Sequence, residues 1–253
     1  PNYFGVQRFG AVRPITHIVG EKIVQGDYEG AVLDYLTLDS PNFAGHEGRE
    51  YLLETKDFTN SLEKFPPHML FERQLLGHLS RNEGDYTGAL LQLPESLSKM
   101  LVHGYQSLIF NKVLDMRIKE GIDACLPQIG DYVMPADGYG GPDQRVTIEV
   151  TERNQSKLSK RCREGKAWVA GLLPGANSNF SKGRQGELEK EVMNDLRIKF
   201  KDFIIDDIPE LSSYGMYRPL FQKYNDIKVD FDSDGPVFTF WLHKGTYATS
   251  FLR

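Results

Sequence analysis

The sequence has few cysteines and no long apolar run, and these two absences exclude several classes of protein. Only Cys125 and Cys162 occur among the 253 residues; they lie far apart, and neither belongs to a Cys-x-x-Cys pair. Neither a zinc site nor a disulfide framework is therefore predicted, and a reducing compartment is expected. No run of about 18 apolar residues exists, and no charged start precedes an apolar stretch. We therefore expect no membrane span, no signal peptide and a cytoplasmic location.

Motifs for metal, nucleotide and serine-hydrolase chemistry are also missing. The six histidines show no His-Glu-x-x-His or other metal-ligand spacing, and we expect them to be structural. No phosphate-binding Gly-x-x-x-x-Gly-Lys loop is present, and no Gly-x-Gly-x-x-Gly segment follows a predicted strand. A Gly-x-Ser-x-Gly nucleophile elbow is absent as well. The sequence therefore predicts no metal, no cofactor and no bound nucleotide cofactor.

The composition is that of an ordinary globular protein, with 40% hydrophobic, 26% charged and 11% aromatic residues. This length fits one large domain or two small ones. The formal net charge of −5 argues mildly against a nucleic-acid partner. Between residues 151 and 168, however, six basic residues face only two acidic ones. This stretch allows a basic binding face, although a solvated helix face is the reading that composition alone favours.

Apolar periodicity predicts a mixture of helices and strands, and so an α+β fold. Helices are expected over residues 27–38, 71–83, 95–120, 155–163 and 187–196. Strands are expected over residues 131–134, 145–150, 167–173, 220–222, 227–231 and 237–242. The intervening turn Asp232-Ser-Asp-Gly-Pro236 predicts a hairpin between the last two strands, because Asp and Gly tolerate the positive φ angles of tight turns.

The first ten residues, Pro1-Asn-Tyr-Phe-Gly-Val-Gln-Arg-Phe-Gly10, resemble the signature motif of the TruD family of pseudouridine synthases. Further matching segments follow in order at residues 13–17, 93–97, 102–111, 130–133, 173–175, 240–249 and 252–253. The resemblance covers the whole chain and is closest to archaeal members. Since the chain starts at Pro1 without a methionine and ends inside a patterned segment, we expect it to be a piece of a longer protein.

The resemblance implies a mixed pseudouridine-synthase sheet, present only in part, that is interrupted by an inserted α/β TRUD domain. Residues 1–26 would belong to the catalytic domain, residues 27–213 to the inserted TRUD domain, and residues 214–253 to the catalytic sheet again. The cleft between the two domains would receive RNA.

The activity that the resemblance implies is that of a tRNA pseudouridine synthase acting without a cofactor on uridine 13 of tRNA. Such an enzyme cleaves the N1–C1′ bond, turns the base and joins C5 to C1′. The family's key catalyst is an aspartate upstream of the Asn-Tyr-Phe-Gly motif. No aspartate of this chain matches that context, so we nominate none and expect the chain to be catalytically incomplete. A non-catalytic RNA-binding module is the alternative, and a structural interaction domain is a third reading.

The substrate-binding residues are also assigned by resemblance. Phe4 would stack against the target base, Asn2 would help to position it, and Arg8 would reach a phosphate or brace its loop. Stacking of a base on an aromatic side chain contributes roughly 1 to 3 kcal/mol. Three further residues would line the synthase cleft: Gly245, Thr246 and Tyr247. The residues alone leave open that Phe4 is a core aromatic and that residues 245–247 form an ordinary strand-to-helix turn.

Four cations of the basic stretch are candidates for contacts with RNA phosphates: Lys157, Lys160, Arg161 and Arg163. The resemblance makes tRNA the expected partner, with no membrane and no nucleotide cofactor, and the sequence identifies no protein partner either way.

A strong family motif also includes His103, Tyr105, Gln106 and Asn111, but these residues lie within the amphipathic helix predicted over residues 95–120. We expect them to pack and to satisfy buried backbone groups at a domain junction, without a catalytic role.

Overall fold

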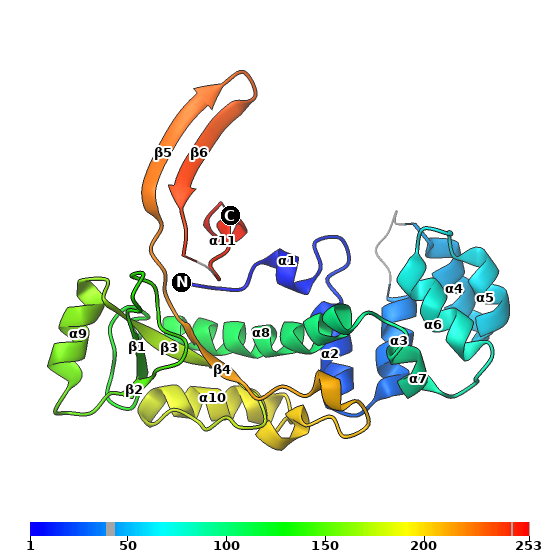
Figure 1. The fold of residues 1–253 in the computed structure, drawn as a ribbon, viewed down its shortest axis with the longest axis horizontal. Helices are drawn as coiled ribbons and strands as arrows, with labels where there is room; N and C mark the ends of the chain where they lie inside the picture. The colour runs from blue at the N-terminus through cyan, green and yellow to red at the C-terminus, as the bar shows by residue number, and fades with distance from the viewer. Residues whose placement is uncertain (39–43, 244, 253) are drawn as a thin grey trace.

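The computed structural model describes residues 1–38, 44–243 and 245–252. Lys244 and Arg253, which belong to the matched C-terminal segments, lie outside these ranges. The helices in the described ranges are α1 (Val6–Phe9), α2 (Thr16–Val24), α3 (Tyr28–Thr37), α4 (His46–Thr55), α5 (Phe58–Lys64), α6 (Leu70–Leu79), α7 (Tyr86–Leu90), α8 (Glu95–Lys119), α9 (Gln155–Arg163), α10 (Gly183–Asp195) and α11 (Ala248–Phe251). The strands are β1 (Tyr132–Pro135), β2 (Ile148–Glu149), β3 (Ala167–Leu173), β4 (Met216–Pro219), β5 (Asn225–Asp232) and β6 (Gly235–Trp241), and two 3-10 turns span Phe200–Phe203 and Pro209–Leu211 (Figure 1).

Helix α8 runs through the middle of the molecule and organises the elements around it (Figure 1). Helix α2 packs directly on α8 because two glycines remove side chains from the contact. A Cβ added at Gly20 would lie 2.0 Å from the carbonyl oxygen of Leu101, and one at Gly104 would lie 2.8 Å from Cγ2 of Thr16. The larger hydrophobic core includes side chains from α2, α3, α8 and α10.

Helices α3 to α7 form a lobe at one end of the long axis (Figure 1). Asp27 caps α3 as predicted, since its Oδ1 accepts the backbone N–H of Gly30 at 2.9 Å. Inside the lobe, the buried Arg49 donates to Oε1 of Glu72 at 2.8 Å and to the carbonyl oxygen of Leu36. These bonds satisfy a charge that would otherwise be costly to bury.

A four-stranded antiparallel sheet with the order β2-β1-β3-β4 packs near the other end of α8. Gly171 in β3 allows the approach: a Cβ there would lie 2.9 Å from Cε2 of Phe110 and 2.5 Å from Cδ2 of Leu220. The second hydrophobic core forms here, and it includes Phe4. The N-terminal segment is thereby anchored between α8 and the sheet.

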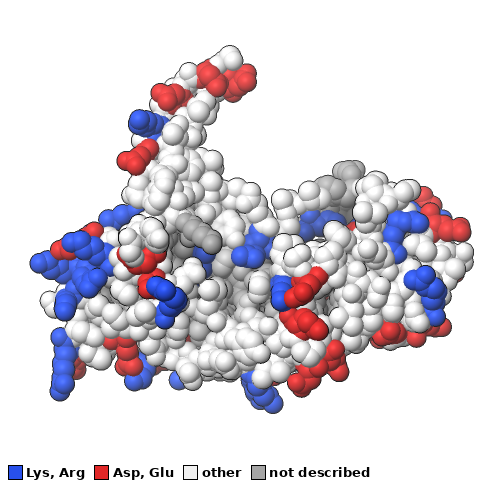
Figure 2. All heavy atoms as spheres, viewed as in Figure 1, with Lys and Arg blue, Asp and Glu red and all other residues white. Residues whose placement is uncertain are grey.

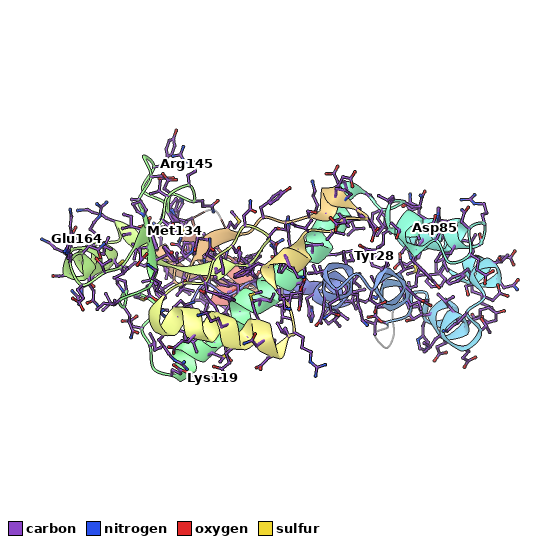
Figure 3. All side chains as sticks on the ribbon, turned by 90° about the horizontal axis from the view of Figure 1, so that it is seen from below. Tyr28, Asp85, Lys119, Met134, Arg145 and Glu164 are labelled. Carbon is purple, nitrogen blue, oxygen red and sulfur yellow. The ribbon has the colours of Figure 1, made fainter. Side chains whose placement is uncertain are left out.

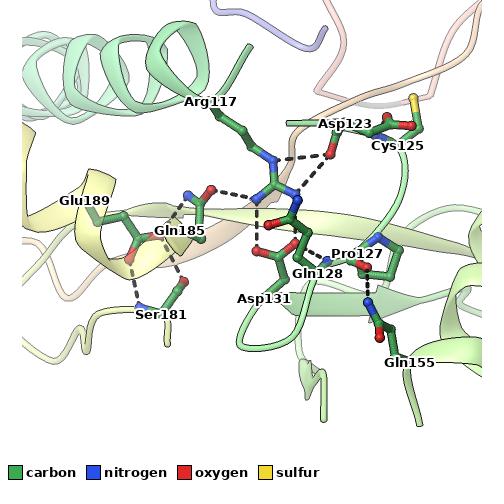
Figure 4. Close-up of polar contacts among 10 residues, drawn as sticks. All are labelled: Arg117, Asp123, Cys125, Pro127, Gln128, Asp131, Gln155, Ser181, Gln185 and Glu189. Atoms are coloured by element: carbon green, nitrogen blue, oxygen red, sulfur yellow. Dashed lines mark hydrogen bonds and ion pairs between the residues drawn. The ribbon is translucent and has the colours of Figure 1, made fainter. Parts of the chain in front are cut away.

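A buried polar network ties α8 to β1 and α10 (Figure 4). Arg117 at the end of α8 binds both carboxylate oxygens of Asp131, at 2.9 and 2.7 Å, and donates to Oε1 of Gln185 at 2.8 Å. Gln185 in turn donates to Glu189, which also accepts two hydrogen bonds from Ser181. This network fixes the angle between the two long helices.

Strands β5 and β6 form a hairpin that projects away from the body (Figure 1). The predicted turn is confirmed, since Asp232 pairs with Gly235. Apolar side chains along the hairpin are exposed, with Phe231 at 80% and Trp241 at 51%. An isolated two-stranded hairpin has little stability of its own. We therefore expect these strands to form the edge of a larger sheet.

The observed elements differ from the predicted ones in identifiable places. The strand predicted over residues 220–222 is wrong: the chain pairs with β3 over Met216–Pro219, and the apolar character of Leu220 reflects burial in the second core. Helix α10 begins at Gly183, four residues before the prediction. Five shorter helices were not predicted: α1, α2, α4, α5 and α7. Helix α11 begins directly after residues 245–247, where a strand-to-helix turn had been considered.

Candidate functional site

The Asn-Tyr-Phe segment is held against α8 and β4 by its backbone. Asn111 of α8 accepts the N–H of Phe4 at 2.9 Å and donates to its carbonyl oxygen at 3.0 Å. Asn2 donates its backbone N–H to Leu220 at 2.8 Å and its side-chain amide to the carbonyl oxygen of Pro219 at 3.0 Å. Asn111 therefore satisfies backbone groups at a junction, as the sequence predicted.

Arg218 in β4 is the centre of the site, and the sequence analysis missed it. Its guanidinium lies 4.0 Å from the ring centroid of Phe4 and donates to Oδ1 of Asn2 at 2.8 Å. It also donates to the backbone oxygens of Asn2 and Gly245. No strand was predicted at Arg218, and its acceptors come from segments that are distant in the sequence, so no local pattern indicates its burial.

Arg218 carries an unusual charge environment. Burial lowers its pKa to about 10, and the nearby Tyr247 and Arg8 act on it in opposite directions. Among the residues that the structure describes, no carboxylate forms an ion pair with it; carbonyl oxygens and an amide oxygen take that place. A guanidinium with this environment can bind an anion without breaking an existing ion pair.

Residues 245–247 lie next to the Asn-Tyr-Phe segment, although 240 positions separate the two in the sequence. Tyr247 contacts Phe4 edge to face, with ring centroids 5.7 Å apart, and its carbonyl oxygen accepts from the hydroxyl of Tyr224. Oγ1 of Thr246 is buried and has no hydrogen-bond partner in the described part of the chain. The structure therefore brings together Asn2, Phe4, Gly245 and Tyr247.

A cavity of about 220 Å³ lies beside the Phe4 ring. Arg8 lines this cavity, with its guanidinium 5.1 Å from the centroid of Phe4 and its buried Nε unpartnered among the described residues. His103 lines it too, and partial burial together with Arg8 and Lys99 lowers the pKa of that imidazole. The described lining includes no carboxylate.

Gln106 forms part of the same wall and is bound to its surroundings. Its Nε2 donates to the carbonyl oxygen of Pro174 at 2.6 Å and to Oγ of Ser213 at 2.7 Å. Tyr105, one residue earlier, is fully buried in the larger core. Both side chains have the packing roles that the helix pattern predicted.

The basic residues of α9 lie apart from the Phe4 site, at the opposite side of the sheet (Figures 1 and 2). Leu158 and Cys162 anchor the helix by their buried side chains. Lys157, Lys160 and Arg163 are exposed, and none of them forms an ion pair within the described residues. Arg161 is half-buried.

None of the described helices is long and apolar enough to cross a membrane. In the same ranges, no group of three or more His, Cys, Asp or Glu side chains is placed to hold a metal ion.

Known proteins resemble this chain along its whole length. The family model described as tRNA pseudouridine synthase D (TruD) matches residues 1–253. A relative named tRNA pseudouridine synthase D from Methanosarcina barkeri is 38% identical over all of this chain and 60% of its own length, and one from Thermococcus sibiricus is 36% identical with the same coverage. The chain thus spans about three fifths of the length of these relatives.

A solved structure shows the same fold. The crystal structure of a tRNA pseudouridine synthase D from Methanosarcina mazei matches with a TM-score of 0.93 at 36% sequence identity. The match covers all of this chain and 60% of that one. The chain therefore belongs to the TruD family of tRNA pseudouridine synthases.

Proposed function

We propose that the protein isomerises a uridine of tRNA to pseudouridine in the cytoplasm, at position 13 by family analogy. The observation that carries this proposal is the aromatic wall of Phe4 beside a cavity of about 220 Å³. Base-modifying enzymes extrude their target base into such a pocket and stack it on aromatic side chains. The NYFG segment that forms the wall is the part of the chain that resembles the family signature most closely.

Each predicted binding residue has a distinct part in this proposal. Phe4 is 6% exposed and belongs to the second core, so a base would reach only the part of its ring that lines the cavity, where Arg8 lies against the same ring. Asn2 acts less directly, because Arg218 and Pro219 engage its side chain. Gly245 and Tyr247 are not in the described lining of this cavity and would act on it through Arg218 and Phe4, and Thr246 has a buried hydroxyl.

We propose that the nucleophilic aspartate is not among residues 1–253. The described lining of the Phe4 cavity contains no carboxylate, and the relatives are longer than this chain. Arg218 lies beside the cavity wall and has no carboxylate partner among the described residues. Its guanidinium can therefore form an ion pair with the carboxylate of the nucleophile. The reaction itself then needs a nucleophile brought to this site by another part of the protein.

The domain division also stays a proposal, with residues 1–26 and 214–253 in the catalytic domain and residues 27–213 in the inserted one. The exposed apolar faces of β5 and β6 support it, because a catalytic sheet would cover them. The packing of α2 argues for an earlier boundary, since Val19 and Ile23 lie in the same core as α3 and α8.

The test is release of tritium from tRNA labelled at uridine C5, since joining C5 to C1′ must expel that hydrogen. A gene product that carries residues 1–253 together with their flanking segments should release tritium, and Phe4→Ala should lower the rate by about tenfold or more, as loss of base stacking predicts. Absence of release while tRNA is still bound would favour a non-catalytic RNA-binding module. Release by residues 1–253 alone would show that the nucleophile lies within them.

Leu173→Val, at the rim of the same cavity, is a matched control, because it changes cavity volume slightly and leaves the aromatic ring in place. Its rate should stay within about threefold of the parent. Mapping of the modified position in the product tRNA tests position 13 separately.

A further inference from the structure

A second cavity, of about 600 Å³, lies beside α9 and shares no lining residue with the Phe4 cavity. Three segments form most of its wall: residues 123–126 after α8, residues 162–169 from the end of α9 into β3, and residues 221–225 between β4 and β5. Gly140 and His243 complete it. This volume lies within the range of about 300 to 1,000 Å³ that encloses small organic ligands.

One wall of this cavity is aromatic. Trp168 and His243 lie with ring centroids 6.1 Å apart at 74°, and both line the cavity. The Trp168 side chain is only half-buried although it belongs to a central strand of the sheet. Flat aromatic surfaces at the edge of a cavity are where unpaired nucleobases stack.

A buried amide lies behind this wall. Gln222 is 3% exposed, and its Oε1 has no hydrogen-bond partner in the described part of the chain. An unsatisfied buried acceptor is rare in proteins because it loses its bonds to water without replacement. Every nucleobase carries at least one N–H group on its edge. A ligand of this kind would donate a hydrogen bond to the Gln222 oxygen and satisfy it.

The charges at the mouth of the cavity favour an anionic ligand. Arg163 and Lys223 are exposed there, and neither forms an ion pair among the described residues. Of the two carboxylates in the lining, Glu164 pairs with Lys166 at 2.9 Å, whereas Asp123 accepts the backbone N–H of Cys125 at 2.6 Å and keeps its negative charge. Arg163, which ends α9, and Lys223 therefore remain for a phosphate, next to the other cations of α9.

We infer that this cavity is a second nucleotide-binding site, which takes an unstacked nucleotide of the RNA at a distance from the modified uridine. The base would lie against Trp168 within reach of Gln222, and its phosphate would contact Arg163 and Lys223. The inference rests on the proposed function, because it takes the RNA substrate as the source of the nucleotide. An RNA strand bound along α9 passes the mouth of this cavity directly.

The two tryptophans of the sequence make a direct test possible, because they are Trp168 and Trp241. In a chain of residues 1–253 that carries Trp241→Phe, Trp168 is the only source of tryptophan fluorescence. We expect tRNA to quench this emission saturably, and 5′-UMP or 5′-AMP to quench it and to compete with tRNA. Unchanged emission at tRNA concentrations that saturate filter binding would overturn the inference.

A pair of variants at Cys125 links the quenching to the cavity itself. Cys125 is exposed and lines the cavity, so Cys125→Phe in the Trp241→Phe background fills space from the wall, whereas Cys125→Ser leaves it open. The phenylalanine variant should bind mononucleotides at least about tenfold more weakly than the serine variant. Equal affinities in two variants with parental circular dichroism would place the nucleotide elsewhere and contradict the inference.

Failure of this inference and failure of the proposed function give different results. Tritium release without a change in Trp168 emission would remove the second site and leave the proposed function in place. Mononucleotide quenching without tritium release would support the site and count against the enzyme. If neither tRNA nor mononucleotides change the emission, the inference is wrong whatever the tritium result.

Discussion

At the scale of single residues, the Phe4 site depends on a side chain that does not belong to the signature segment. Arg218 joins Asn2, Phe4 and Gly245 through hydrogen bonds and a contact with the ring face. The segments that it joins are more than 200 positions apart in the sequence. A charged side chain with several fixed acceptors orients a loop more firmly than an apolar side chain can, because each bond has a preferred direction.

Replacing Arg218 by lysine should destabilise the protein. Lysine keeps the charge but cannot serve acceptors on Asn2 and Gly245 at once, so we expect Arg218→Lys to lower the free energy of unfolding by about 2 kcal/mol. Urea denaturation followed by circular dichroism measures this. Arg145→Lys is the control, since Arg145 is 84% exposed and its pair with Asp143 should contribute less than about 1 kcal/mol. Equal effects of the two variants would contradict the role given to Arg218.

At the scale of elements, the contact between α2 and α8 is set by the absence of side chains. Gly20 faces the backbone of α8 directly, and Gly104 faces Thr16 from the other helix. Such close packing of two helices leaves no room for even a methyl group, since a backbone carbonyl cannot move aside as a side chain can.

Gly20→Ala should therefore destabilise the fold, by about 1 to 3 kcal/mol, because its Cβ would lie 2.0 Å from the carbonyl oxygen of Leu101. Gly77→Ala in α6 is a matched control, since no atom lies within 4 Å of the added Cβ. The control should be neutral or stabilising by up to about 1 kcal/mol, as alanine favours helix. The two free energies of unfolding can be compared by urea titration. A neutral Gly20→Ala would mean that the helices do not approach as described.

The polar network between α8 and α10 makes stability depend on pH. Burial raises the pKa of Glu189 above its usual 4.5, although bonds from Gln185 and Ser181 oppose this shift. The folded state therefore holds a proton that the unfolded state has already released between 4.5 and the raised value. Stability from the neutral carboxyl is fully present below pH 4.5 and is lost as pH rises through the folded pKa.

Comparison with Glu189→Gln isolates this titration, because glutamine has no proton to lose. As pH rises from about 4 to 7, the difference in unfolding free energy should shift in favour of the variant, by at most about 1.4 kcal/mol per pH unit. Any constant cost of the amide cancels in this comparison. A difference that stays flat over the whole range would show that the pKa of Glu189 is not raised.

At the scale of the whole molecule, the cations of α9, the helical lobe and the exposed apolar side chains of the hairpin occupy three different regions. The cations of α9 occupy one end of the long axis, near Glu164, and the helical lobe with Asp85 occupies the other (Figure 3). The hairpin of β5 and β6 carries acidic residues near its tip and exposed apolar side chains along its length (Figure 2). An acidic protein can in this way present one basic surface to an RNA backbone.

The contribution of that surface can be measured by the salt dependence of tRNA binding. Lys160→Ala combined with Arg161→Ala should reduce the slope of log affinity against log salt by up to about 1.4 to 1.8, since each phosphate contact contributes roughly 0.7 on single strands and 0.9 on B-form duplexes. The control pair, Lys64→Ala with Arg81→Ala in the helical lobe, should leave the slope unchanged. Equal slopes for both pairs would remove α9 from the RNA contact.

The sequence by itself determined the family, the α+β class and most of the long elements. The 95–120 helix, the 155–163 helix, the 167–173 strand and the final hairpin follow from periodicity and turn residues, which act locally. The roles of Gln106 and Asn111 were also predictable, because polar residues on a buried helix face must find partners.

Only the tertiary structure decided what lies at the centre of each site. Arg218, Gln222 and Trp168 gain their significance from burial and from neighbours that are distant in the sequence, and no local pattern reports such distances. The strand predicted over residues 220–222 failed for the same reason: Leu220 is apolar because it fills the second core, not because it continues a strand. Secondary-structure propensity depends on residues that are neighbours in the sequence, whereas burial depends on how the whole chain packs.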